Sequence, residues 1–435
     1  MIALRRASTD AVRCRPTALQ ELLLRACISD EPTALAAWRR WSASVDLDRI
    51  DEESLRHLPL ACHRLQGAAP RDRTFRIAKG VYRRAWYRNQ LLLGKLTGVL
   101  DVLADARIDG LLLKGTSLAT RYYPRPATRP MVDIDVLVPH REAERAVAVL
   151  QREGWRPVKR TPPSVLVHYA HAVSLVRDQV NLDLHWNALW PQRRADADRP
   201  FWESAQRIDH QGRPAYALAA TDELFHACMH GARLSQNAYS WAPFPLLRWV
   251  TDAFMIARSS EIDWKRIDAL AGRFHARLHM RDAFSYLRTD VGLPVPGALL
   301  DEWARTRSAA DRLHYDLALA PRRPRLFADL PRFRFWKSYR MKAYIDQHAS
   351  RAGAPSGLAR LAGFPAYVAA FVKADLDAER LRDVPVELAR KLGNRPALMV
   401  PYRSAGGYDA RRFTDDELRA ASSAAGARGP GVGAD

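Results

Sequence analysis

The amino-acid sequence predicts an α+β fold in which a short sheet with its own helices lies between helical N- and C-terminal regions. Apolar residues recur at helical spacing through the first ninety residues and again from Thr221 onward, which indicates helices in both regions. Between them, residues 107–190 alternate short apolar runs with amphipathic segments, as expected where strands and helices alternate along a chain.

The expected organisation has five parts. A helical N-terminal region (1–90) precedes the core that carries the sheet (91–200), and a helical C-terminal domain follows (201–345). A helical extension (346–402) and a tail rich in Gly, Ala and Ser (403–435) complete the chain, and the composition of the tail predicts disorder.

The composition is that of a folded and strongly basic protein. With 435 residues, 48% of them hydrophobic, and a net charge of +20, the chain can form a substantial core and attract phosphate-rich partners. Nucleic acid is a possible partner but not a favoured one, because the arginines are spread along the chain and no known nucleic-acid-binding module accompanies them. No apolar run reaches the ~20 residues needed to cross a bilayer, and the N-terminus lacks the apolar segment of a secretory signal, so we expect a cytoplasmic protein without a membrane span.

The cysteines argue against two kinds of site. They are scattered and include no C-x-x-C pair, which disfavours both a cysteine zinc site and a disulfide framework. Reduced, mostly buried thiols are therefore expected at Cys14, Cys27, Cys62 and Cys228.

The first predicted strand of the core, residues 110–113, ends at a Lys-Gly pair. Glycine lets the backbone approach a phosphate closely, and the helix expected next would direct its N–H groups toward that phosphate. Thr116 or Ser117 is the expected N-cap of this helix. The candidate nucleotide-binding residues are Lys114, Gly115, Thr116, Ser117 and Arg129, with Arg121 a weaker candidate.

The remaining elements of the core are a strand at 131–138, a helix at 141–153 and a hairpin of strands at 172–176 and 180–186. Gly154 stands where a helix C-cap is expected. The predicted order is therefore strand, helix, strand, helix and a pair of strands.

Three aspartates form the candidate catalytic centre. Side chains two apart on a strand point the same way, so Asp133 and Asp135 project together from one face of the second strand. Asp183 leaves a later strand that is expected to pair near the first one. Neighbouring carboxylates repel one another unless a cation lies between them, and carboxylate oxygens suit Mg²⁺ or Mn²⁺. We predict that all three residues are metal ligands and that one of them can act as a general base.

Each feature also has a plain structural interpretation. A lone Lys-Gly pair is usually a turn, and a lone Asp-x-Asp is usually a solvated strand face. The ordered set favours the functional interpretation, because it combines strand, Lys-Gly, helix, Asp-x-Asp strand, helix and a later strand with a single Asp.

Three stretches of the core carry a resemblance to a known family. They are LLLKGTSLATRYYPRPATRPMVDIDVLV at 111–138, GW at 154–155 and NLDLHW at 181–186. Together they resemble a bacterial family of nucleotidyltransferases within the DNA polymerase β superfamily. The Asp-Ile-Asp-Val-Leu-Val block is the most specific part, and the similarity covers roughly residues 20–290.

The resemblance implies a polymerase β-like core, built as a small mixed sheet with helices. It also implies metal-dependent transfer of a nucleotidyl group from a nucleoside triphosphate such as ATP, with Asp133, Asp135 and Asp183 as the metal ligands. Many members of the superfamily have Gly-Gly or Gly-Ser where this chain has Lys114-Gly115. The resemblance therefore leaves open how this chain binds the triphosphate.

The leading functional hypothesis is an enzyme that transfers a nucleotide to a hydroxyl-type acceptor on a small molecule, a peptide or a protein, as an accessory to a biosynthetic pathway. Two alternatives stay open. One is a catalytically silent scaffold that still binds nucleotide, and the other is an RNA-directed nucleotidyltransferase, which only the basic charge favours.

Several polar residues outside this set are expected to be structural. His226 and His230 lie on one helix face at a spacing that can bind zinc, but no third ligand is evident, so two histidines lining the cleft are expected. Arg248 and Asp252, four residues apart, are expected to form an ion pair along a helix. His168, His171 and His185 could face the active site, whereas Trp155, Trp186 and Trp190 are expected in the core or at the rim.

Overall fold

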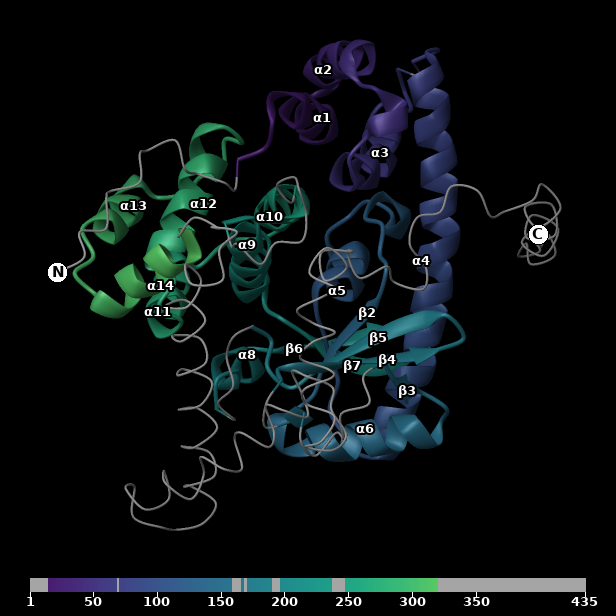
Figure 1. Cartoon of the computed structure of the whole chain (residues 1–435), viewed down its shortest axis with the longest axis vertical. Helices are drawn as coiled ribbons and strands as arrows, with labels where there is room; N and C mark the ends of the chain where they lie inside the picture. Colours follow the sequence, from purple (N-terminus) through teal and green to yellow (C-terminus); the bar gives the residue numbers. More distant parts are fainter. Residues whose placement is uncertain are drawn as a thin grey trace, which may run out of the picture. The chain divides into compact units, whose positions relative to one another are not determined.

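The computed structural model describes six stretches of the chain, which are residues 15–68, 70–158, 166–167, 170–189, 196–236 and 247–319 (Figure 1). All of them belong to one compact unit, Met1–Pro401. The predictions of a helical extension at 346–402 and of a disordered tail at 403–435 lie outside the described residues, as do His168 and Trp190.

Aspartates and a threonine start the N-terminal helices. Thr17 forms a capping box with Gln20, and each of the next three α-helices has an Asp side chain that accepts a backbone N–H of its first turn. The helices are α1 (Ala18–Ile28), α2 (Glu31–Ser44), the 3-10 helix η1 (Leu47–Arg49), α3 (Glu52–Arg64) and α4 (Arg73–Asp105). They bury a core of their own around Trp38, Trp41 and Phe75.

Seven strands form one mixed sheet in the order β3-β4-β5-β2-β1-β7-β6. Two neighbouring pairs, β2 with β5 and β1 with β7, are parallel, and the other pairs are antiparallel. The strands are β1 (Leu111–Leu112), β2 (Ile134–Leu137), β3 (Arg156–Pro157), β4 (Ala172–Arg177), β5 (Val180–His185), β6 (Gln206–His210) and β7 (Arg213–Ala217). The expected mixed sheet is thus confirmed.

Helices cover both faces of the sheet. Alternate residues of β2, Ile134 and Val136, pack with the C-terminal half of α4 and with α6 (Ala143–Arg152), whereas Leu137 packs with the C-terminal helices. Figure 1 shows the long helix α4 beside the strands, with α6 next to its C-terminal end. The shorter helices of the core are α5 (Lys114–Arg121), η2 (Pro126–Thr128), η3 (His140–Glu142) and α8 (Arg199–Glu203).

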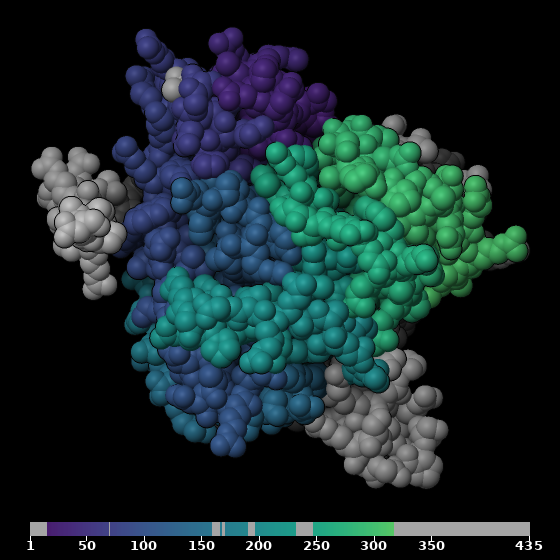
Figure 2. Space-filling view, turned by 180° about the vertical axis from the view of Figure 1, so that it is seen from behind, coloured from purple at the N-terminus to yellow at the C-terminus, as the bar shows by residue number. Residues whose placement is uncertain are grey.

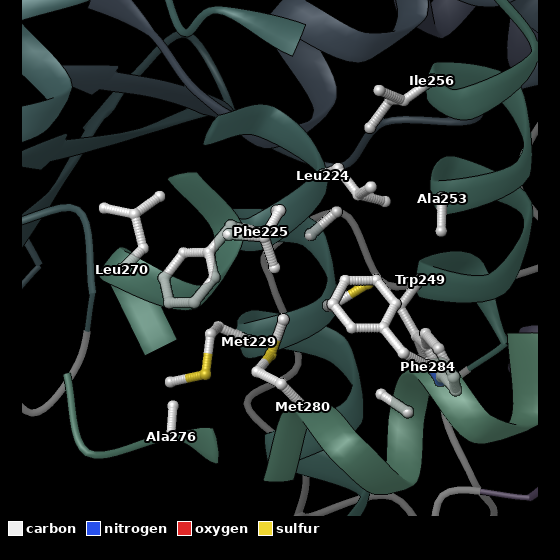
Figure 3. Packing of buried hydrophobic residues seen from close by; sticks show 14 of the residues in the cluster. Leu224, Phe225, Met229, Trp249, Ala253, Ile256, Leu270, Ala276, Met280 and Phe284 are labelled. Atoms are coloured by element: carbon white, nitrogen blue, oxygen red, sulfur yellow. The ribbon is translucent and has the colours of Figure 1, made fainter. Parts of the chain in front are cut away.

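The C-terminal helices pack around α9 (Ala220–Gln236) and α10 (Arg248–Ser259). Figure 3 shows their shared core, in which Phe225 lies on the side of Leu270 and Trp249 on the side of Phe284, with Met229 and Met280 between them. A Cβ atom added to Gly231 would lie 2.1 Å from the Cβ of Trp249, so glycine is required where these two helices meet. The other helices are α11 (Trp264–Arg273), α12 (Arg277–Thr289), α13 (Gly297–Ala304) and α14 (Ala309–Leu319).

The N-terminal helices contact α10 directly. His57 Nε2 lies 3.3 Å from Thr251 Oγ1, and the Glu53 carboxylate accepts a hydrogen bond of 3.0 Å from the backbone N–H of Leu247. Figure 2 shows the purple and blue N-terminal residues beside the green C-terminal helices. In the part of the chain that the structure describes, no helix combines the length and the apolar character needed to cross a membrane.

Three details differ from the sequence-based expectations. Neither Thr116 nor Ser117 caps α5, because the helix begins at Lys114 itself, without a side-chain cap. β2 begins at Ile134 instead of Met131, since the residues before Ile134 connect η2 to the strand. The β6–β7 hairpin was not predicted, because β6 is mostly polar and exposed and therefore lacks a clear apolar pattern.

Candidate active site

Strand pairing brings two of the predicted aspartates together. β2 and β5 run parallel, and Asp135 is the register partner of Asp183. Residues paired in this way point to the same side of a sheet, so the two carboxylates leave it side by side. Ligand atoms of Asp135, Asp183 and His185 all lie within 4.8 Å of one another. Asp133 precedes β2, is partly buried and is not a member of this group of three.

Lys114 supplies the positive charge nearest to this cluster. Its Nζ donates a hydrogen bond of 2.6 Å to Asp135 Oδ1, and His185 Nε2 lies 3.0 Å from the same oxygen. Burial alone would raise the pKa of Asp135, but the Lys114 ammonium and the His185 ring hold that pKa well below its usual range. The backbone of Lys114 has φ of 46°, a conformation that is unfavourable for a side chain of this size and is often found at functional sites.

One lysine does not neutralise the whole cluster. Burial, followed by the charges of Asp135 and Asp183, raises the pKa of Asp133 to about 7. The charges here are therefore unbalanced toward the negative side, which is the condition under which a bound cation is stabilised. Among the described residues, the cluster of Asp135, Asp183 and His185 is the one group with three potential metal ligands.

The donor set fits a divalent metal. Carboxylate oxygens are typical ligands of Mg²⁺, and an added imidazole nitrogen also suits Mn²⁺. Nε2 is the ring nitrogen of His185 that faces the cluster, since it lies 3.0 Å from Asp135 Oδ1, whereas the buried Nδ1 has no hydrogen-bond partner within the described stretches. Because Lys114 now holds Asp135 Oδ1, a metal on that oxygen would have to share it with the ammonium.

Arg129 is fixed by a partner that the sequence analysis did not assign to it. Its Nε and Nη2 donate hydrogen bonds of 2.7 and 2.8 Å to the two carboxylate oxygens of Asp252. Tyr123 adds a hydroxyl hydrogen bond of 2.7 Å to Asp252. The predicted Arg248–Asp252 pair is therefore wrong: Arg248 lies beside Glu53, with its Nε 3.5 Å from Glu53 Oε1.

Arg129 still reaches the loop that was predicted to bind phosphate. A Cβ added to Gly115 would lie 3.1 Å from Arg129 Nη1 and 3.1 Å from Met131 Cγ, so Gly115 permits this close approach. The third guanidinium nitrogen of Arg129 thus lies beside the first turn of α5 while the other two hold Asp252.

The hydroxyl groups of the same turn point into the protein. Thr116 Oγ1 lies 2.6 Å from the carbonyl oxygen of Leu113, and Ser117 Oγ donates 2.8 Å to Glu223 Oε2. Both residues are fully buried, backbone included, so neither offers a surface to a phosphate. Glu223 was not predicted to belong to the site, and its buried position raises its pKa to about 7 despite Ser117 and Arg121 nearby.

A cavity of about 120 Å³ opens beside the cluster. Its walls combine residues of the core with residues of α9 and α10, among them Lys114, Gly115, Arg129, Asp133, Asp135, His226, His230 and Arg248. The expectation that His226 and His230 line the cleft is confirmed. Their rings stack with centroids 6.2 Å apart, and His226 Nε2 lies 3.1 Å from the carbonyl oxygen of Ala188. Burial, and then the Lys114 charge, lower the pKa of His226 to about 4, so this ring is neutral near pH 7.

The comparisons with known proteins give one family and two distantly similar solved structures. A family model described as "Uncharacterised nucleotidyltransferase" matches residues 53–289, whereas no curated protein matches the chain. The solution structure of the antibiotic-resistance factor ANT(2'')-Ia is similar to 46% of this chain and 98% of its own, with 14% identity and a TM-score of 0.31. A nucleotidyltransferase-like protein of Paracoccidioides brasiliensis, described as antigenic, matches 48% of this chain and 96% of its own, with 15% identity and a TM-score of 0.34.

Proposed function

The chain belongs to this family of uncharacterised nucleotidyltransferases, and we propose that it moves a nucleoside monophosphate from a nucleoside triphosphate to a hydroxyl group of a small molecule, a peptide or a protein. The observation that carries the proposal is the register of β2 and β5, which sets Asp183 beside Asp135, a residue of the cavity wall. The polymerase β-like character of the core, and a place as an accessory enzyme of a biosynthetic pathway, belong to the same proposal.

We assign metal binding to Asp133, Asp135 and Asp183, with His185 as an additional donor. A divalent cation held there, Mg²⁺ or Mn²⁺, would supply charge stabilisation for the phosphoryl group in transfer. The unbalanced carboxylates support this assignment, since burial and like charges already act against the ionised form of Asp133.

The nucleotide-binding residues are assigned to the first turn of α5 and to Arg129. The first turn of α5 starts without a side-chain cap, and Lys114 and Gly115 line the cavity, so their backbone N–H groups can donate to phosphate oxygens. Thr116 and Ser117, the other two residues predicted to bind nucleotide, are fully buried and support this turn from inside the protein. The ammonium of Lys114 and Nη1 of Arg129 add positive charge near this turn.

The chemistry then follows from the arrangement. The acceptor oxygen forms a bond to the α-phosphorus, the bond from that phosphorus to the bridging oxygen breaks, and pyrophosphate leaves. The proton of the acceptor hydroxyl passes to one of the three carboxylates, which acts as a general base. Lys114 and Arg129 stabilise the charge that develops on the departing pyrophosphate.

A transfer assay tests the proposal. The purified protein is incubated with each labelled nucleoside triphosphate, a cell extract and Mg²⁺ or Mn²⁺, and the labelled product is identified by mass analysis. We expect one product carrying an added nucleoside monophosphate, which is absent when Asp135→Asn replaces the wild type. Release of inorganic phosphate alone, without a nucleotidylated product from any extract, would overturn the proposed reaction.

A further inference from the structure

Three cations line the cavity, and they differ in how firmly they are held. Lys114 donates 2.6 Å to Asp135, and Arg129 makes two hydrogen bonds of 2.7 and 2.8 Å to Asp252. Arg248 lies only within ion-pair distance of Glu53, at 3.5 Å, and its buried Nε has no hydrogen-bond partner in the part of the chain that the structure describes. A guanidinium has five N–H donors, so Arg248 has donors to spare at the wall of the cavity.

Glu53 has three other donors, although burial raises its pKa and the Arg248 charge is the largest of the effects that lower that pKa against the rise. Its carboxylate accepts hydrogen bonds from the backbone N–H groups of Leu247 and Arg248, at 3.0 and 3.4 Å. Arg56 adds a side-chain hydrogen bond of 3.1 Å to Glu53. The Arg248 guanidinium can therefore turn away while the buried carboxylate keeps three donors, which offset part of the charge interaction that is lost.

The backbone of Arg248 is held in place while its side chain is not. Glu53, on α3, caps the first turn of α10 from outside that helix, and this fixes where the Arg248 side chain starts. The side chain is 27% exposed, compared with 7% for Arg129. The backbone of Arg248 is fixed, its guanidinium has unused N–H donors, and it lines a cavity that Lys114 and Asp133 also line. These properties suit it to bind an anion that enters the cavity.

We propose that Arg248 is a substrate-binding residue that leaves Glu53 and makes a forked contact with the terminal phosphates of the nucleoside triphosphate. This inference rests on the proposed function, because it names the group that the cavity holds. Guanidinium groups bind phosphate oxygens through two parallel hydrogen bonds, and such charged bonds are stronger than neutral ones. Arg129 has already committed two of its nitrogens to Asp252, so it cannot provide this fork without breaking a buried pair.

Calorimetry on substituted protein tests the assignment. Affinities for ATP, GTP, CTP and UTP, and for the matching monophosphates, are measured with Mg²⁺ for the wild type and for Arg248→Gln. The control is Arg258→Gln, which removes the same charge from the exposed last turn of the same helix. We expect Arg248→Gln to weaken binding of the preferred triphosphate by about ten- to a hundredfold, the effect of losing a charged hydrogen bond, and to change monophosphate affinity far less. Arg258→Gln should change neither affinity.

The ratio of triphosphate to monophosphate affinity is measured within one variant, so it does not depend on how much of that variant is folded. Arg248→Lys should keep part of the affinity, because it retains the charge but loses the fork. Unchanged triphosphate affinity in Arg248→Gln, or an equal loss for monophosphate, would overturn the role of Arg248 and leave the proposed function standing. A wild type that binds no triphosphate at all would overturn both.

Discussion

Two buried groups of charges stand close together in this protein, and they are built differently. In the network between the residues around η2 and α10, Arg129 and Asp252 neutralise each other through two hydrogen bonds, and Tyr123 donates a further hydrogen bond to the carboxylate. In the cluster on and beside β2 and β5, the charges of three aspartates surround Lys114, which makes its ion pair with Asp135. A matched pair stabilises a fold, whereas unmatched carboxylates require a ligand, so the comparison separates structural charges from functional ones.

The largest expected effect lies in the matched network. Arg129→Gln leaves the buried Asp252 carboxylate without its guanidinium, and breaking a buried pair in this way costs about 3–5 kcal/mol of unfolding free energy. Urea denaturation of the purified variant measures the loss. Adding Asp252→Asn to the same chain removes the stranded charge, so the double variant should be less destabilised than the sum of the two single variants. If the losses of unfolding free energy in the two single variants simply add up in the double variant, Arg129 and Asp252 do not stabilise each other.

The unmatched cluster should respond in the opposite way. Asp135→Asn removes one of several carboxylates that repel one another, and the charges of Asp183 and Asp133 still balance that of Lys114. The variant should therefore still fold. Transfer activity should fall on the order of a hundredfold or more, because electrostatic stabilisation of the reacting phosphoryl group is lost. Asp133→Asn and Asp183→Asn should behave alike. Transfer rates and melting temperatures of all three variants check this, and near-wild-type rates would refute the site assignment.

Glu223 sharpens the comparison through its pH dependence. Burial raises its folded pKa to about 7 from the reference of 4.5, with Arg121 and Arg129 acting against the rise and Asp252 adding to it. The stability linked to this proton is present below pH 4.5 and lost as pH rises through about 7. Glu223→Gln should therefore gain about 2 kcal/mol relative to wild type between pH 5 and pH 8. Denaturation curves at both pH values measure it, and exposed Glu203→Gln should show no such change.

The smallest effect is expected at His226. Its ring lines the cavity but is neutral near pH 7 and contacts the carbonyl oxygen of Ala188. His226→Ala should cost transfer activity no more than a few-fold, far below the loss from the aspartate variants. Steady-state transfer rates decide the point. A loss as large as that of Asp135→Asn would make the histidine a participant in the reaction.

The sequence contained most of the local structure of the site. Alternation of apolar and polar residues identified β2 and β5, and their pairing confirms that Asp135 and Asp183 lie together. Gly154, predicted as a helix C-cap, has φ of 86°, which favours glycine.

Long-range partners were harder to predict. Arg129 and Asp252 are 123 residues apart, and Asp252 lies at helical spacing from Arg248, so the local pair was preferred over the true one. The caps of α5 were missed for a related reason. The hydroxyl groups of Thr116 and Ser117 bond to Asp135 and Glu223, which only the tertiary fold brings near.

The most direct test of the unmatched cluster is the metal dependence of nucleotide binding. Calorimetric titration of the wild type with the preferred nucleoside triphosphate is carried out once with Mg²⁺ and once in EDTA. The triphosphate and the three aspartates repel each other, so we expect affinity at least about tenfold higher with the metal, a difference of about 1.4 kcal/mol. Asp135→Asn should reduce this metal dependence. Equal affinity in Mg²⁺ and in EDTA would contradict the account, because the cluster would then need no cation to accept the nucleotide.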